Sequence, residues 1–139
     1  MDLDPKLEGL LAGTHNGVLA TIKRDGLPQL SNITYGYDRD TRTAQISVTQ
    51  TRAKTRNLRR DPRATLYVPG ADFWTFTVAE ARAELTDPAT DVNDATVEAL
   101  VGYYRSIRGE HPDWAEYRQV MVDESRVLLT LRVDRLYGQ

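Results

Sequence analysis

Short stretches of alternating apolar and polar residues recur along the whole chain, and turn residues separate them. The pair Asp25-Gly26, which is typical of hairpin turns, joins the first two stretches. Short connections favour antiparallel neighbours, because parallel strands need a crossover of about a dozen residues or more. The stretches expected to form strands are residues 17–23, about 28–37, 44–49, 64–68, 74–85 and 127–137. Six antiparallel strands with a few short helices predict a mainly β fold, a small barrel rather than a doubly wound sheet.

Helix signals lie between and before these strands. Asp4 and Pro5 predict the N-cap and first residue of a short helix, which Gly13 ends. Apolar side chains at helical spacing, or a capping sequence, predict further helices at residues 96–107 and 114 to about 122. The strand at 74–85 is long, so we expect it to bend or to serve two sheets.

Length and composition narrow the class of protein. A chain of 139 residues with 40% hydrophobic residues is expected to form one domain, residues 1–139, with its own core. It has no cysteine, and its two histidines, His15 and His111, lie far apart, so we expect no metal site and no thiol nucleophile. The sequence shows no signal peptide pattern and no apolar run of membrane-spanning length. We therefore expect a cytoplasmic protein that does not bind membranes.

One basic segment stands out in a chain whose formal net charge is -2. Five of the nine residues from Arg52 to Arg60 are basic, directly after the strand at 44–49, and Pro62 limits the helix that they predict. With Thr51 as the expected N-cap, Arg52 and Lys54 lie at the positive end of this helix, where a phosphate binds well. The alternative is a solvated basic stripe, because these cations also recur at helical spacing. A nucleic-acid patch is disfavoured, since the pI is about 5.7 and the cluster contains no aromatic residue.

No glycine-rich nucleotide loop accompanies this segment, which excludes a Rossmann-type cofactor site. The second strand, at 28–37, mixes apolar residues with the amides and hydroxyls of Gln29, Ser31 and Asn32. A strand that faces only core and solvent more often alternates apolar residues with charged ones. The mixture is therefore unusual for such a strand.

The Arg-x-Lys pattern in residues 52–63 resembles that of the pyridoxamine-phosphate-oxidase-like split β-barrel flavoproteins. More narrowly, the chain is similar to the branch of this flavin/deazaflavin oxidoreductase superfamily that uses the deazaflavin coenzyme F420. The resemblance continues through residues 17–22, 25–32, 78–80, 98–100 with Tyr104, and 126–131, so it covers nearly the whole chain.

The resemblance implies a six-stranded FMN-binding-like split β-barrel, and a homodimer whose cofactor groove lies at the subunit interface. It implies that Arg52 and Lys54 hold the cofactor phosphate and that Asn57 supports them. Further cofactor contacts that it implies are Gln29, Ser31 and Asn32 along the ring system and ribityl-type chain, Ser47 on the neighbouring strand, Trp74 beside the open ring face, and Arg126 from the second subunit. Gln29 and Asn32 lie on opposite faces of a regular strand. One of them therefore contacts the cofactor through a bulge or through its backbone, or does not contact it at all.

The implied function is hydride transfer between reduced F420 and an unsaturated or conjugated small organic acceptor. No catalytic side chain is assigned, because the cofactor carries the chemistry in enzymes of this type. Two alternatives stay open: an FMN-binding oxidase or flavin reductase, and a non-catalytic F420 carrier. Both cofactors carry a phosphate, so Arg52 and Lys54 do not distinguish them. The additional cations Arg56, Arg59 and Arg60 favour F420, whose lactyl-oligoglutamate tail carries further negative charge.

Overall fold

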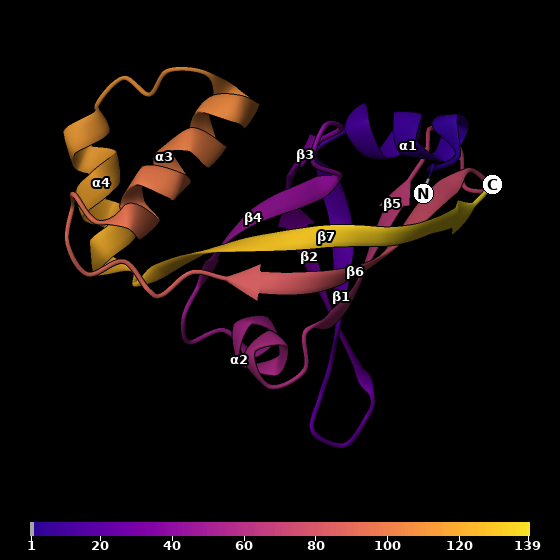
Figure 1. Cartoon of the computed structure of the whole chain (residues 1–139), viewed down its shortest axis with the longest axis horizontal. Coiled ribbons are helices and arrows are strands. Elements are labelled where there is room, and N and C mark those ends of the chain that lie inside the picture. Colours follow the sequence, from indigo (N-terminus) through magenta and orange to yellow (C-terminus); the bar gives the residue numbers. More distant parts are fainter. Residues whose placement is uncertain (1) are drawn as a thin grey trace.

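A curled antiparallel sheet forms the body of the molecule in the computed structural model, which describes residues 2–139 (Figure 1). Its hydrogen-bonded order is β2-β1-β5-β6-β7-β4-β3. The strands are β1 (Asn16–Ile22), β2 (Pro28–Thr34), β3 (Gly36–Asp38), β4 (Thr43–Thr49), β5 (Arg63–Pro69), β6 (Phe76–Leu85) and β7 (Arg126–Gly138). The helices are α1 (Pro5–Ala12), α2 (Ala53–Arg60), α3 (Ala95–Arg108) and α4 (Trp114–Asp123).

The mainly β, split-barrel prediction is confirmed, with one strand more than expected. Alternate residues of each strand point inward and build the core, in which Leu19, Leu66 and Leu129 are fully buried. The strand predicted at 28–37 is divided at Tyr35, so β2 and β3 are separate. Tyr35 marks a change of partner: its amide still donates to the His15 carbonyl in the register of β1 and β2, whereas Gly36 already pairs with Gln45 of β4. The Tyr35 hydroxyl donates to the Leu11 carbonyl at 2.6 Å.

The barrel is open along one line. The strands β2 and β3 lie at opposite edges of the sheet although only Tyr35 separates them in sequence. Only the end of β4 up to Gln45 pairs with β3, and within residues 2–139 the remainder pairs with β7 alone. The outer edge of β2 likewise has no strand partner among these residues. We call this opening between β2 and residues 46–49 of β4 the seam.

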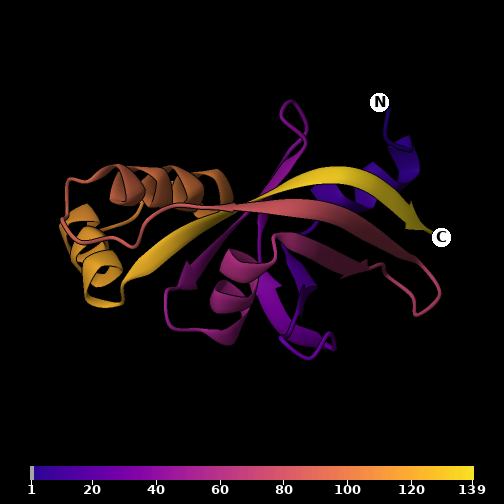
Figure 2. The ribbon, with the colours of Figure 1, turned by 60° about the horizontal axis from the view of Figure 1, so that its bottom comes forward.

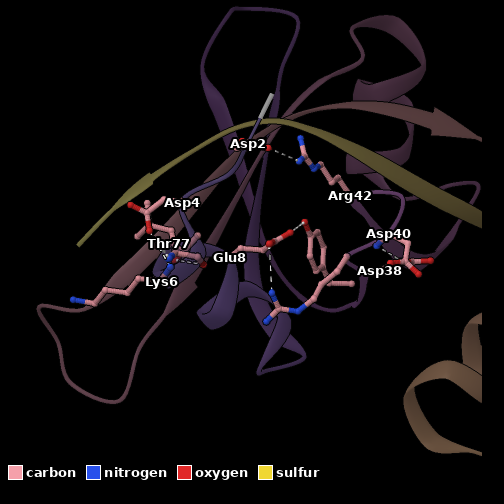
Figure 3. A network of polar contacts seen from close by, with 11 residues as sticks. Asp2, Asp4, Lys6, Glu8, Asp38, Asp40, Arg42 and Thr77 are labelled. Atoms are coloured by element: carbon pink, nitrogen blue, oxygen red, sulfur yellow. Dashed lines mark hydrogen bonds and ion pairs between the residues drawn. The ribbon is translucent and has the colours of Figure 1, made fainter.

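Helix α1 covers one end of the barrel. It begins as predicted, because the Asp4 side chain accepts from the amides of Lys6 and Leu7, and Gly13 is the C-cap. Glu8, on α1, accepts a 2.7 Å hydrogen bond from the hydroxyl of Tyr37, on β3 (Figure 3). The hydroxyl of Thr77, on β6, donates to the Leu7 carbonyl.

Helices α3 and α4 form a separate layer beyond the ends of β4 and β7 (Figure 2). They have their own core, in which Leu100, Tyr117 and Met121 pack against Leu128 of β7. Both helices lie where the sequence predicted them, and Asp113 caps α4 through the Glu116 amide. No helix of the described residues has both the length and the apolar composition that a bilayer crossing requires.

The strand predicted at 74–85 begins later than expected. It starts at Phe76, because the Asp72 carboxylate accepts from the amides of Trp74 and Thr75 and folds these residues into a turn. Trp74 therefore lies in this turn and not in the strand. The expected bend is present as a register shift between Glu80 and Ala81.

Candidate functional site

Helix α2 begins at one end of the seam. The Thr49 carbonyl, at the end of β4, accepts from the Arg52 amide and from the Thr55 hydroxyl at 2.7 Å, which fixes the turn into the helix. The prediction that Thr51 is the N-cap is wrong: the N-cap is Arg52, one residue later, and its side chain makes no capping hydrogen bond. The first-turn amides, which a capping side chain would engage, therefore lie at the positive end of the helix dipole without one.

Four of the predicted site residues line one hollow at this end of the seam. Gln29 and Ser31 come from β2, and Arg52 and Lys54 from the start of α2; with Ala53 they enclose about 140 Å³. The Ser31 hydroxyl is buried and has no hydrogen-bond partner within residues 2–139. A buried hydroxyl without a partner costs about 1–3 kcal/mol, so this group is suited to a ligand that supplies one.

Asn57 holds the wall of this hollow. Its amide nitrogen donates to the Thr21 hydroxyl at 3.1 Å and to the Gln29 side chain at 3.2 Å. Its oxygen accepts from Arg60. Because all these contacts are to protein groups, Asn57 orients Gln29 from behind rather than facing the hollow.

Lys54 lies close to other positively charged side chains. Partial burial lowers its pKa, and the nearby charges of Arg52 and Arg126 lower it further. Within residues 2–139 neither Arg52 nor Lys54 forms a salt bridge. The excess positive charge at this point favours a bound anion, which would offset both the burial and the repulsion.

Within its own chain, Arg126 lies beside Ser47 of β4. The prediction that Arg126 reaches the cofactor from a second subunit stays a prediction. The Arg126 guanidinium lies 3.4 Å from the Ser47 carbonyl oxygen and 3.5 Å from the Ser47 hydroxyl, across the pair of strands β4 and β7. It also bonds Glu124 at 2.8 Å. Ser47 and Arg126 therefore lie together along the seam, beyond Lys54.

A larger hollow of about 510 Å³ continues from the first one and shares Gln29 and Ala53 with it. Its other lining residues are Lys23, Arg24, Asp25, Arg56, Asn57 and Arg60. The hairpin between β1 and β2 and helix α2, which supply these residues, lie at the same end of the molecule (Figure 1). We call the two hollows together the seam groove.

The cations of the larger hollow differ in their partners. Arg56 forms no salt bridge within the described chain, Lys23 pairs with Asp25 at 3.8 Å, and Arg60 donates to the Ile22 carbonyl. Arg59 points elsewhere and donates to Gln50 and to the Thr86 carbonyl.

Two predicted site residues lie outside the seam groove of their own chain. Asn32 follows Ser31 on β2 and therefore faces the other side of the sheet, where it lines a different hollow with Val18 and Pro69. Trp74 lies in the loop after β5. Strand β5 starts near the end of α2 and is about 20 Å long, so this loop lies at its far end. Figures 1 and 2 place this loop beside the C-terminus.

Sequence reasoning missed Tyr103 and the hairpin cations Lys23 and Arg24. Tyr103 projects from α3, and its hydroxyl donates to the Thr34 carbonyl at 3.2 Å at the other end of the seam. The position of Lys23 and Arg24 beside the Asp25-Gly26 turn was a signal for a basic hairpin tip. No sequence signal pointed to Tyr103, because helical spacing gave priority to its neighbour Tyr104.

The donors that converge on the smaller hollow suit a phosphate monoester. Arginine, lysine and unpaired helix amides bind its oxygens, and Ser31 and Gln29 suit the hydroxyls of an adjoining polyol chain. The residues present therefore fit the phosphate end of a flavin-type cofactor.

Solved structures with the same fold support this description of the architecture. A conserved hypothetical protein of Mycobacterium tuberculosis is 22% identical, over 98% of this chain and 83% of its own, with a TM-score of 0.71. An F420 reductase is 23% identical, over 95% and 96% of the two chains, with a TM-score of 0.65. The heme storage protein HutZ of Vibrio cholerae is 14% identical, over 99% and 95%, with a TM-score of 0.69.

At these identities the structures establish the fold alone, and their different ligands show that the fold serves more than one function. The sequence profile described as pyridoxamine 5'-phosphate oxidase, however, matches residues 3–139, which is nearly the whole chain. The chain belongs to the pyridoxamine 5'-phosphate oxidase family.

Proposed function

We propose that this chain is an oxidoreductase that binds coenzyme F420 in the seam groove and passes a hydride to an unsaturated organic acceptor. The observation that carries the proposal is the buried Ser31 hydroxyl without a partner, beside two cations that form no salt bridge within the described residues. The family membership and the likeness to an F420 reductase add support.

Each residue has a defined task in this proposal. Arg52, Lys54 and the first-turn amides of α2 bind the phosphate, and Ser31 donates to or accepts from the oxygens next to it. Gln29, held by Asn57, fixes the adjoining chain. Arg126 and Ser47 contact it further along the seam. When bound, the cofactor supplies the hydride, so the protein has to orient it and exclude water rather than provide a nucleophile.

The larger hollow favours F420 over FMN. Arg56, Arg24 and Lys23 lie beyond the phosphate position, where FMN has no further charge and F420 continues into its glutamate tail. FMN remains the second candidate, because the smaller hollow contacts only groups that the two cofactors share.

Fluorescence titration with each cofactor tests the proposal. Lys54→Met keeps the aliphatic part of the side chain and removes the charge, so it should weaken binding by about 10- to 150-fold, as expected for a charge-assisted hydrogen bond worth about 1.5–3 kcal/mol. The matched control is Lys6→Met, on the exposed face of α1, which should bind like the parent. Equal affinity of Lys54→Met and the parent would contradict the phosphate assignment.

The same preparation distinguishes an enzyme from a carrier. Stopped-flow mixing of the F420H2-loaded protein with quinones and enones should oxidise the bound cofactor faster than the free one. A panel that yields no acceleration, with tight F420 binding retained, would favour the carrier. Tight FMN binding without F420 binding would favour the flavin alternative.

A further inference from the structure

The seam begins at a defined hydrogen-bond position. The ladder between β3 and β4 pairs Gly36 with Gln45, and continuation of this register would place Thr34 opposite Ser47. These two residues are not paired with each other; β2 has left β4 at this point. The first missing strand-to-strand hydrogen bond of the barrel is therefore the one between Thr34 and Ser47.

The hydroxyl of Tyr103 lies in that position. It donates to the Thr34 carbonyl at 3.2 Å. Burial raises the pKa of this phenol, and the nearby Ser47 backbone opposes the rise. One side-chain oxygen thus bonds the Thr34 carbonyl and lies beside the Ser47 backbone, between two groups that would pair directly if the register of β3 and β4 continued.

Helix α3, which carries Tyr103, packs closely against the start of β3. A Cβ added to Gly36 would lie 3.1 Å from Ile107, which shows that the helix packs against the backbone at the start of β3. The Tyr103 hydroxyl is therefore carried by a rigid element that rests on the junction between β2 and β3.

We propose that Tyr103 is a positioning residue that holds β2 and β4 apart at the head of the seam and so fixes the width of the seam groove. Its oxygen bonds the Thr34 carbonyl and occupies the space beside Ser47, so the strands do not close. We call the Tyr103 hydroxyl between the two strands the strut. The identity of the ligand rests on the proposed function, whereas the strut rests on the register of the strands. Tyr103 acts through Ser47 and does not itself contact the phosphate position, which lies at Arg52 and Lys54.

Amide hydrogen exchange measured by NMR on the ligand-free full chain tests the strut directly. Tyr103→Phe removes only the oxygen, so the Ser47 amide should exchange about tenfold faster or more, while its circular dichroism stays unchanged. The control is Tyr104→Phe, the adjacent tyrosine, whose ring packs against His111, Trp114 and Tyr117. It should leave Ser47 exchange as in the parent. Ile107→Ala removes part of the contact between α3 and the start of β3. It should therefore accelerate exchange of the Ser47 amide although Tyr103 is intact.

Binding measurements on the same variants test the positioning role. Tyr103→Phe should lose about 3- to 10-fold in affinity for the whole cofactor and bind inorganic phosphate like the parent. Unchanged Ser47 exchange in Tyr103→Phe would overturn the strut. Faster exchange with full cofactor affinity would overturn the positioning role. A parent that binds neither F420 nor FMN contradicts the proposed function, and Ser47 exchange then still decides the strut.

Discussion

Lys54 carries a positive charge in a place that disfavours one. It is partly buried and lies near Arg52 and Arg126, and it forms no salt bridge within the described residues. The unfolded chain therefore binds the lysine proton more tightly than the folded chain does. Between the lowered pKa and the ordinary one, unfolding takes up a proton, so folding becomes more favourable as pH rises through that window.

This sign gives a prediction for the ligand-free protein. Lys54→Met should be more stable than the parent at neutral pH, and the difference should shrink as pH rises through the lowered lysine pKa. Urea unfolding of both proteins over a series of alkaline pH values measures the difference. A gain that does not depend on pH would show that packing, rather than the charge, is responsible.

At the scale of single elements, the proposed function assigns different parts of the ligand to α2 and to the β1–β2 hairpin. The start of α2 suits a phosphate, and the cations of the hairpin and of the outer face of α2 surround the larger hollow. The two parts are contiguous but contact different portions of a long ligand. They should therefore respond separately to substitution.

Arg56→Gln tests this division. Removal of this charge should lower F420 affinity by about twofold to fivefold, because an exposed cation contributes about 1 kcal/mol or less to pairing with a solvated anion. FMN affinity should not change. The control is Arg59→Gln on the same helix, whose guanidinium bonds Gln50 and Thr86 outside the groove. An equal loss for both cofactors in Arg56→Gln would contradict the assignment of the larger hollow.

The elements also show what the sequence could and could not reveal. Asp4, Gly13 and the Asp25-Gly26 turn act through neighbours in sequence, and the helix and strands that they limit were predictable. The division of the second strand at Tyr35 was not predictable, because it depends on a change of partner from β1 to β4, which are not neighbours in sequence.

The candidate site follows the same rule. The basic start of α2 was visible as a local pattern, whereas the contact of Arg126 with Ser47 depends on the pairing of β4 with β7. The Tyr103 bridge depends on where α3 packs. Both contacts depend on packing between segments far apart in sequence, which the spacing of residues along the chain does not reveal.

At the scale of the whole molecule, several large apolar side chains remain exposed. Phe73 and Trp74 are 81% and 72% exposed in one loop, and Leu30 is 66% exposed on the outer face of the sheet. Leu30 lies opposite Ala20, on the side of β2 that faces away from the core. Such surface is suited to association, and a second copy is the partner that the family resemblance implies.

This gives a prediction for the quaternary structure. The parent should sediment at twice its 15.7 kDa chain mass, and Leu30→Arg should sediment as a monomer, since a buried unpaired charge opposes the interface. Analytical ultracentrifugation measures both. Arg135→Leu, at an exposed position on β7, serves as a substitution that should not change the mass. A monomeric parent would leave Asn32 and Trp74 without a route to the seam groove.

The open seam has a consequence beyond ligand binding. Bare strand edges are templates on which a neighbouring molecule can add a strand, and proteins protect such edges with lysine and arginine. Here the edges of β2 and β4 end beside Arg52 and Lys54. The charges that we propose bind a phosphate therefore also repel another copy's edge, and a chain without them is expected to be less soluble.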